Sequence, residues 1–382
     1  MLEPYRVLDL TDHRGDLGPM ILGDLGADVI KIEPPGGSAG RRSGPFLNAG
    51  DAAERSLRFF AYNRNKRSIQ LDVNDAADRA VLDTLIAGAD FIFESHPTTD
   101  AACRLDHHDL CRLNPTIVHV IVSPFGIDGP ASERIANDLT LSALGGRAAL
   151  QGSPDRPPVR MSVPQAWRHA SAEAAAAAII AHARMRVTGK AQLVDVSAQC
   201  AMTWTMMNAM DAHAIQGFEF ERMGSMVQMG TREVDPVFAC ADGHLVALPT
   251  GTVLNALLGH VAGDGLLDER WLIEDWETFD ERFVAGEDVN FTREEIRDVF
   301  ARYFALHTKA ELFELGHEAG VTLAPINTVA DLTRFDQLDA RHAWHTTELP
   351  NGQRVKTPGI FAKFNQAPMR LRYAPPRLDC QR

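Results

Sequence analysis

The stretch RVLDLTDHRGDLGPMILGDLGADVIKIE, residues 6–33, decides the fold class of this 382-residue chain. It begins with a short apolar run at residues 6–10, of the kind that forms a β-strand. After a polar turn, residues 19–25 have helical spacing, and residues 28–32 form a second apolar run. A strand, a helix and a strand at this spacing make a βαβ unit. The sequence therefore predicts an α/β fold with a parallel sheet.

The same stretch argues against a nicotinamide cofactor. Glu33, which closes the second strand, resembles the ribose-binding acid of dinucleotide-binding folds. The first turn lacks the G-x-G-x-x-G pattern, and it places Asp12 and Asp16 where a pyrophosphate would lie. We therefore expect no tightly bound cofactor.

Composition narrows the class of protein. The chain is 45% hydrophobic and 23% charged, which is typical of a globular protein, and its length favours two domains. A net charge of -13 disfavours nucleic acid or an anionic membrane as a partner, because both attract a broad positive field. The five cysteines form no C-x-x-C pair, so we expect neither a disulfide framework nor a metal site.

The expected location is the cytoplasm. The first residues, Met1 to Pro4, have no basic region followed by an apolar run, as a secretory signal would. The longest run of small apolar residues, 174–181, is far too short to span a membrane. We expect a soluble protein that does not insert into membranes.

A basic cluster, Asn65, Lys66 and Arg67, directly precedes the predicted strand at residues 69–73. Ligands of open α/β sheets bind at strand ends, and cations there could bind a phosphate. A solvated surface turn explains the same residues equally well. The residues alone leave both interpretations open.

The stretch at residues 157–189 places a polar segment before an Ala-rich helix. Trp167, Arg168 and His169 stand at the predicted helix start, and Gly189 is a plausible stop. The backbone N–H groups of a helix start could bind a thioester oxygen or a phosphate. A simple helix cap is the more frequent use of such a segment.

Short strings along the whole chain make it similar to the family III CoA-transferases, the group of formyl-CoA transferase, carnitine CoA-transferase and 2-methylacyl-CoA racemase. The strings occur in the order in which that family has them. They are LDLT at 8–11, LGADVIKIEPPGG at 25–37, NKRS at 65–68, LNP at 113–115, DGP at 128–130, VDV at 194–196, ADG at 241–243 and APINT at 324–328.

The resemblance implies an interlocked homodimer of ring-like subunits. It implies a large Rossmann-like CoA-binding domain at residues 1–215, a smaller α+β domain with its linkers at 216–330, and a C-terminal segment at 331–382 that returns to the large domain. Coenzyme A or acyl-CoA would be a substrate, together with a carboxylic acid. By this resemblance, the residues that contact CoA are Asn65, Lys66, Arg67 and Arg104.

The resemblance also implies that the active site of this chain differs from that of the family. Family transferases use an aspartate that attacks the acyl-CoA thioester, and Trp167 stands at the position of that aspartate. An indole cannot form an anhydride, so His169 and Glu173 become the candidates for a relocated catalytic group. The family racemases pair this aspartate with a histidine, and Asn137 stands at the histidine position.

Three alternative functions are consistent with the missing aspartate. The first is a CoA-transferase with a non-standard active site. The second is a racemase, isomerase or lyase that acts on an acyl-CoA by acid–base chemistry. The third is an acyl-CoA-binding protein, such as a regulatory or partner subunit.

Overall fold

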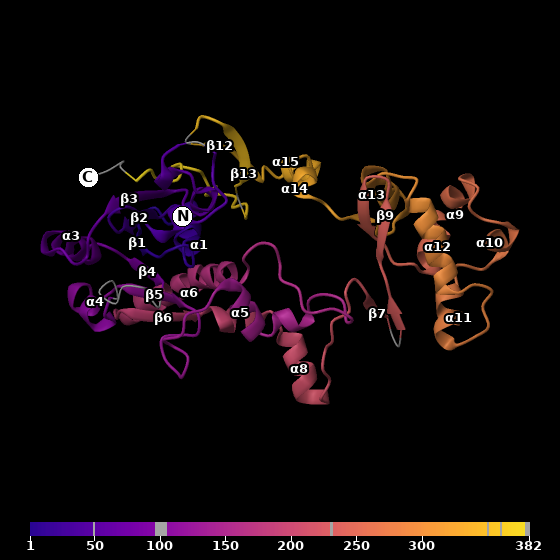
Figure 1. Cartoon of the computed structure of the whole chain (residues 1–382), viewed down its shortest axis with the longest axis horizontal. Coiled ribbons are helices and arrows are strands. Elements are labelled where there is room, and N and C mark those ends of the chain that lie inside the picture. The colour runs from indigo at the N-terminus through magenta and orange to yellow at the C-terminus, as the bar shows by residue number, and fades with distance from the viewer. Residues whose placement is uncertain (49, 96–104, 230–231, 350, 360, 379–382) are drawn as a thin grey trace. The chain divides into compact units, whose positions relative to one another are not determined.

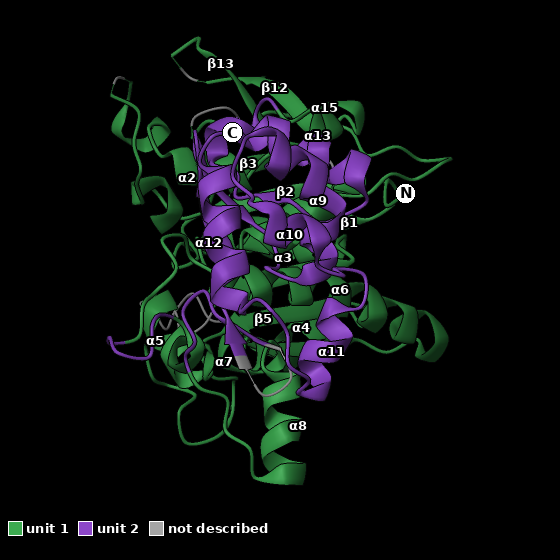
Figure 2. Ribbon diagram, turned by 90° about the vertical axis from the view of Figure 1, so that its right-hand side faces the viewer, with its two compact units in different colours: residues 1–151, 158–221, 335–382 green, residues 152–157, 222–334 purple. Residues whose placement is uncertain are grey.

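The computed structural model describes residues 1–48, 50–95, 105–229, 232–349, 351–359 and 361–378. The chain divides into two compact units (Figure 2). Unit 1 contains residues 1–151, 158–221 and 335–382, and unit 2 contains residues 152–157 and 222–334.

Unit 1 is built on a six-stranded sheet in the order β3-β2-β1-β4-β5-β6. Every neighbouring pair in this sheet is parallel, which confirms the predicted α/β fold with a parallel sheet. This is the strand order of dinucleotide-binding folds, in which the order reverses between β1 and β4. The strands are β1 (Arg6–Leu10), β2 (Asp28–Glu33), β3 (Lys66–Gln70), β4 (Phe91–Ser95), β5 (Val118–Ser123) and β6 (Gln192–Ser197).

Helices cover both faces of this sheet (Figure 1). Successive strand residues point to opposite faces, so Val7 packs with α1 and α6, while Leu8 packs with α3 and α4. The described helices of unit 1 are α1 (Leu17–Asp24), α2 (Leu57–Tyr62), α3 (Ala76–Ala87), α4 (His107–Leu113), α5 (Asp138–Leu144), α6 (Ala166–Thr188), α7 (Ala198–Trp204), α8 (Met207–Gln216) and α15 (Asp336–Ala340).

Helix α6 is the long central helix of unit 1, with 23 residues. Its buried face carries Ala170, Ala174 and Ala178, whose small side chains allow close packing against the sheet. The helix ends at Gly189, which has a left-handed φ of 67° that favours glycine. The predicted stop at this residue is confirmed.

The C-terminal segment of unit 1 packs back onto the first strands. It contains a hairpin of β12 (Trp344–Glu348) and β13 (Arg354–Pro358). Asn65 fixes the following stretch, because its Oδ1 accepts hydrogen bonds from the backbone N of Arg372 and of Tyr373. Residues more than three hundred positions apart are thereby joined.

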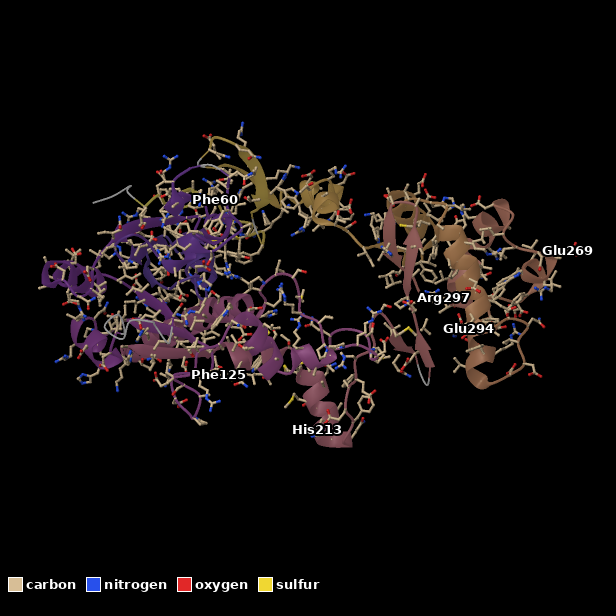
Figure 3. The ribbon with its side chains drawn as sticks, in the orientation of Figure 1. Phe60, Phe125, His213, Glu269, Glu294 and Arg297 are labelled. Carbon is tan, nitrogen blue, oxygen red and sulfur yellow. The ribbon has the colours of Figure 1, made fainter. Side chains whose placement is uncertain are left out.

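Unit 2 contains a three-stranded antiparallel sheet and a helical layer with an aromatic core that includes Trp276 and Phe279. Arg297, labelled in Figure 3, bonds to Asp235 and lies over the ring of Phe238. The elements are β7 (Val227–Met229), β8 (Arg232–Val234), β9 (Val237–Cys240), β10 (Gly243–Val246), α9 (Gly251–Gly263), α10 (Glu269–Ile273), α11 (Phe279–Ala285), α12 (Arg293–Phe304), α13 (Lys309–Ala319), β11 (Ala324–Pro325) and α14 (Val329–Leu332).

Among the described residues, no helix combines the length and the apolar character that a membrane span needs.

Candidate functional site

The carboxyl ends of β1 and β4 mark the position where ligands bind in this class of sheet. Ser95 ends β4 there, and its side chain is buried. Its Oγ has no hydrogen-bond partner within the described part of the chain. The β1 loop packs directly against it, because a Cβ added to Gly15 would lie 3.0 Å from Ser95 Oγ and 2.7 Å from Thr11 Cγ2. This edge therefore offers a buried hydroxyl beside a tightly packed backbone.

The amino end of α6 is fastened to this β1 loop. Ser171 Oγ donates a hydrogen bond to the carbonyl oxygen of Gly15 at 2.8 Å. Arg168 Nη1 donates to Asp16 Oδ1 at 2.7 Å, and its guanidinium lies 3.6 Å from the centre of the Tyr62 ring. These contacts place the start of α6 beside the sheet edge described above.

Trp167 lies in the first turn of α6 and points into the hydrophobic core. Only 3% of the surface of Trp167 is exposed to solvent. The guanidinium carbon of Arg14 lies 5.8 Å from the centre of its ring, and its backbone N donates to Asp138 Oδ1 at 3.4 Å. An indole therefore occupies the core at this turn, and it offers no carboxylate that could attack a thioester.

His169 and Glu173 lie on the other side of α6. At 100° per residue, they point about 200° and 240° around the helix from Trp167. His169 is half-buried and Glu173 is exposed. Neither side chain occupies the place of the indole, so the structure does not bring the predicted catalytic residues to the Trp167 position.

The protonation of both candidates departs from the ordinary values. The pKa of His169 is lowered, because burial disfavours the imidazolium and Arg147 repels it, which outweighs the attraction of Asp138. The pKa of Glu173 is raised, because its carboxyl is partly desolvated although the residue as a whole is exposed.

Lys66, a predicted CoA contact, is completely enclosed within the fold. Its Nζ donates to Asp9 Oδ2 at 2.7 Å, to the carbonyl oxygen of Asp16 at 2.7 Å and to Asn63 Oδ1 at 2.8 Å. An ammonium has three N–H donors, and all three are used here. In this structure Lys66 therefore holds the β1 loop rather than facing solvent.

Asn65 and Arg67 also have partners inside unit 1. Asn65 is buried, and its Nδ2 donates to Asp24 Oδ1 at 2.7 Å. Arg67 is partly exposed, and its Nη2 donates to Asp28 Oδ1 at 2.7 Å. This basic cluster lies at the start of β3, whereas ligands of such sheets bind at the carboxyl ends. Its contact with CoA stays a prediction, and the fourth predicted contact, Arg104, lies outside the described residues.

Glu33 does not have the free carboxylate of a ribose-binding acid. Burial raises its pKa, but the hydrogen bonds and charge of Arg41 outweigh that effect and lower the pKa to about 2. Its Oε2 accepts from Arg41 Nε at 2.7 Å and from the backbone N of Ser38 at 3.0 Å, while Oε1 accepts from Ser68. Glu33 therefore fixes the loop that follows β2.

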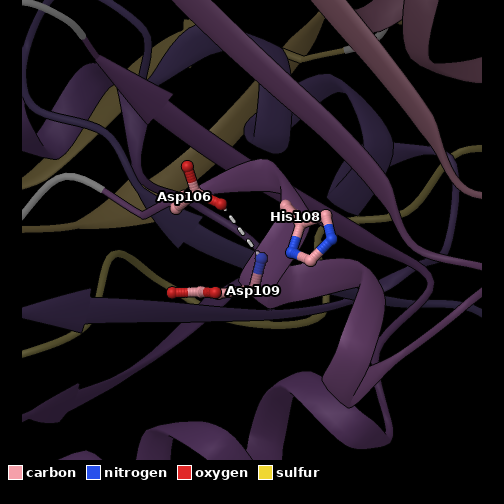
Figure 4. A group of neighbouring side chains, drawn as sticks. All are labelled: Asp106, His108 and Asp109. Carbon is pink, nitrogen blue, oxygen red and sulfur yellow. Dashed lines mark hydrogen bonds between the residues drawn. The ribbon is translucent and has the colours of Figure 1, made fainter.

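One group of side chains resembles a set of metal ligands. Ligand atoms of Asp106, His108 and Asp109 lie within 4.8 Å of one another, and all three residues are exposed (Figure 4). Asp106 Oδ1 accepts a hydrogen bond from the backbone N of Asp109, which makes it the cap of α4. The cap explains this arrangement without a metal ion.

A small cavity lies beside the amino end of α6 and has a volume of about 70 Å³. Asp138 lies on its wall, and Asp138 Oδ2 accepts from the backbone N of Gln165 at 3.1 Å. Two arginines, Arg147 and Arg160, complete the charged part of the lining. The other lining residues are Leu139, Ser142, Gln151, Met161 and Pro164.

Sequence reasoning gave no role to Asp9 or Asp138. Asp9 is buried between Lys31 and Lys66. In the sequence, the feature that could have indicated its role is a single acid inside an otherwise apolar strand. Asp138 follows Asn137, which caps α5 through its side chain. No local pattern relates Asp138 to Gln165, because the two meet only across the fold.

The chain matches the family model described as CoA-transferase family III over residues 2–382. It is 33% identical to the succinyl-CoA:(R)-benzylsuccinate CoA-transferase subunit BbsE of Thauera aromatica, over 98% of this chain and 90% of that protein. It is 26% identical to the succinyl-CoA–D-citramalate CoA-transferase of Chloroflexus aurantiacus, over 99% of this chain and 91% of that protein. A CAIB/BAIF family protein from Brucella suis has a similar crystal structure, with a TM-score of 0.81 and 27% identity over 99% of this chain and 96% of that one.

Proposed function

We propose that this chain, a member of CoA-transferase family III, acts on dicarboxylic acids. Enzymes of this family transfer CoA between an acyl-CoA and a carboxylic acid. The relatives reported above are named for succinyl-CoA with benzylsuccinate and for succinyl-CoA with D-citramalate. Each of these acids carries two carboxyl groups. Succinyl-CoA is the donor in both names, and we propose a donor of this class here.

The reaction requires a carboxylate as the attacking group. A carboxylate attacks the thioester carbon, which releases the CoA thiolate and leaves a mixed anhydride. The thiolate then attacks the enzyme's carboxyl carbon, which frees the donor acid and leaves an enzyme-bound CoA thioester. The acceptor acid repeats these steps in reverse and leaves as the new acyl-CoA.

We propose that the attacking carboxylate belongs to a second chain of the same family. The observation that carries this proposal is the burial of Trp167 in the core at the amino end of α6. His169 and Glu173 point to the other side of that helix, so they are weaker candidates. The name of the Thauera relative describes a subunit, which is consistent with a chain that works together with another.

Helix α8 supports assembly of this chain with a partner. Figure 1 shows α8 projecting away from the rest of unit 1, and Figure 3 labels His213 on it. None of its residues is buried. Large apolar side chains are exposed along α8 and its flanks, namely Trp204, Met207, Met210, Ile215 and Phe218. An apolar surface of this kind favours a dimer, either with a second copy or with a related chain.

We place the CoA substrate at the carboxyl ends of β1 and β4. The reversal of the strand order at this point creates the crevice in which such sheets bind ligands. The unbonded hydroxyl of Ser95 supports this position, because a buried polar group is normally hydrogen-bonded.

A CoA-transfer assay tests the proposed function. The purified chain is incubated with succinyl-CoA and glutarate, alone and together with a family III chain that carries an aspartate at the position of Trp167. We expect transfer in the mixture and little transfer by the chain alone. Full activity of the chain alone would show that its own residues supply the attacking group. Absence of transfer to glutarate in both samples would contradict the proposed substrates.

A further inference from the structure

The cavity beside α6 contains two positive side chains that have no carboxylate partner among the described residues. Arg147 is half-buried, and its Nη2 donates to the weakly accepting Sδ of Met161 at 3.6 Å. Arg160 Nη1 donates to the carbonyl oxygen of the same methionine at a long 3.4 Å. Within the part of the chain that the structure describes, neither arginine forms a salt bridge. Both guanidinium groups therefore keep N–H donors for another acceptor.

The acid on the same wall does not neutralise these arginines. Asp138 directs its Oδ2 to the backbone N of Gln165 and its Oδ1 to the backbone N of Trp167. The cavity wall carries one carboxylate and two guanidinium groups, so it has a net positive charge. The charge of Arg147 also lowers the pKa of nearby His169, after the larger effect of burial. The cavity is thus an electropositive place in an acidic protein.

The cavity suits a small anionic group. Its volume of about 70 Å³ is several times the roughly 10–15 Å³ of cavity space that one water molecule needs, so it accommodates a group of the size of a carboxylate. It cannot hold a whole CoA thioester. A guanidinium matches the two oxygens of a carboxylate with parallel hydrogen bonds.

We propose that Arg147 and Arg160 bind the non-reacting carboxylate of a dicarboxylic substrate in this cavity. The inference rests on the proposed function, since only a dicarboxylic acid offers a second carboxylate once the first has reacted. It makes the two arginines specificity-determining residues. They favour succinate-like and glutarate-like acids over acids with a single carboxylate.

Direct binding tests this proposal without any catalytic step. Glutarate and butyrate are titrated into the full-length protein by calorimetry, for the unmodified chain and for the double variant Arg147→Gln, Arg160→Gln. We expect the double variant to bind glutarate roughly 10- to 100-fold more weakly, because two charge-assisted contacts are lost. Butyrate binding should be weak in both proteins. The matched control is Arg134→Gln, which removes an exposed arginine outside the cavity lining and should leave glutarate binding unchanged.

The outcomes distinguish this inference from the proposed function. Equal glutarate binding by the unmodified chain and the double variant overturns the inference, as does the absence of glutarate binding to the unmodified chain. In the transfer assay with the second chain, the double variant should raise the KM for glutarate and leave the KM for a monocarboxylic acceptor unchanged. If both KM values rise together, the arginines do not determine specificity. If no acid accepts CoA, the proposed function fails, and the binding result still decides the role of the cavity.

Discussion

The ammonium of Lys66 and the carboxylate of Asp9 lie 2.7 Å apart, and neither side chain is exposed to water. Lys31 joins the same carboxylate at 3.2 Å, so two cations share one buried acid. Burial lowers the pKa of Lys66 to about 8, although the charge of Asp9 opposes this shift. The cluster fixes the β1 loop through the bond from Lys66 to the carbonyl oxygen of Asp16.

Replacement of Lys66 should therefore destabilise the fold. We expect Lys66→Met to lower the free energy of unfolding by about 1–3 kcal/mol, because the carbonyl oxygen of Asp16 and Asn63 Oδ1 lose their buried donor while Lys31 still pairs with Asp9. Urea unfolding measures this change. Arg67→Ala is the control, because its partly exposed pair with Asp28 contributes about 1 kcal/mol or less. An unchanged stability of Lys66→Met together with weaker CoA binding would instead support the predicted phosphate contact.

Acid should weaken the contact between Glu33 and Arg41. The pKa of Glu33 is lowered from 4.5 to about 2, so its contribution is complete above pH 4.5 and is lost as the pH falls toward 2. Glu33→Gln should reduce stability at pH 7 and flatten the decline of the unfolding free energy between pH 4.5 and 2. Chemical unfolding at several pH values measures both effects. Glu318 is exposed, so in Glu318→Gln the unfolding free energy should fall between pH 4.5 and 2 as much as in the unmodified protein. If it also falls by the same amount in Glu33→Gln, the Glu33 carboxylate is not the group that causes this fall.

Ser171 should be important for the position of the α6 start. Its buried Oγ donates to the carbonyl oxygen of Gly15 and accepts from the backbone N of Gly18, both at 2.8 Å. We expect Ser171→Ala to cost about 1–3 kcal/mol, because both backbone groups lose their partner. Thermal and urea unfolding measure the change. The exposed Thr84→Ala is the control and should change stability by about 0.5 kcal/mol or less. A loss no larger than that of the control would show that water replaces the hydroxyl.

Charges on α8 should disrupt assembly. Met210 is 54% exposed and Ile215 is 80% exposed, so glutamate at both positions should be tolerated by an isolated subunit. In an assembly that covers α8, the same change buries two charges and should release monomers. Sedimentation measures the mass. Ile273→Glu on α10, where the side chain is 83% exposed, is the control for a surface charge elsewhere. An unmodified chain that is already monomeric, or a double variant with unchanged mass, would contradict this role of α8.

Much of the fold was predictable because its signals are local. The apolar runs at residues 6–10 and 28–32 and the helical spacing between them predict a parallel unit, and the sheet has this unit as β1, α1 and β2. Gly189 ends α6 as predicted, because glycine adopts the left-handed backbone conformation of this position at little energetic cost. The family strings at residues 8–11 and 25–37 belong to these same elements.

The candidate site was less predictable because its contacts join distant residues. Lys66 and Arg67 are adjacent in the sequence, yet one is enclosed by the β1 loop and the other pairs near the surface. The alternation of side chains across β3 directs them to opposite faces. A basic cluster in the sequence therefore does not remain one cluster in space.

By itself, the sequence determined the fold class, the family and the indole at the position of the family's aspartate. Tertiary structure alone decided that Trp167 points into the core while His169 and Glu173 point away from it, because the packing of α6 on the sheet selects which face is buried. It also brought Asp138, Arg147 and Arg160 to one cavity. Hydrophobic periodicity acts over a few residues, whereas the partners of a buried charge are set only when separate elements pack together.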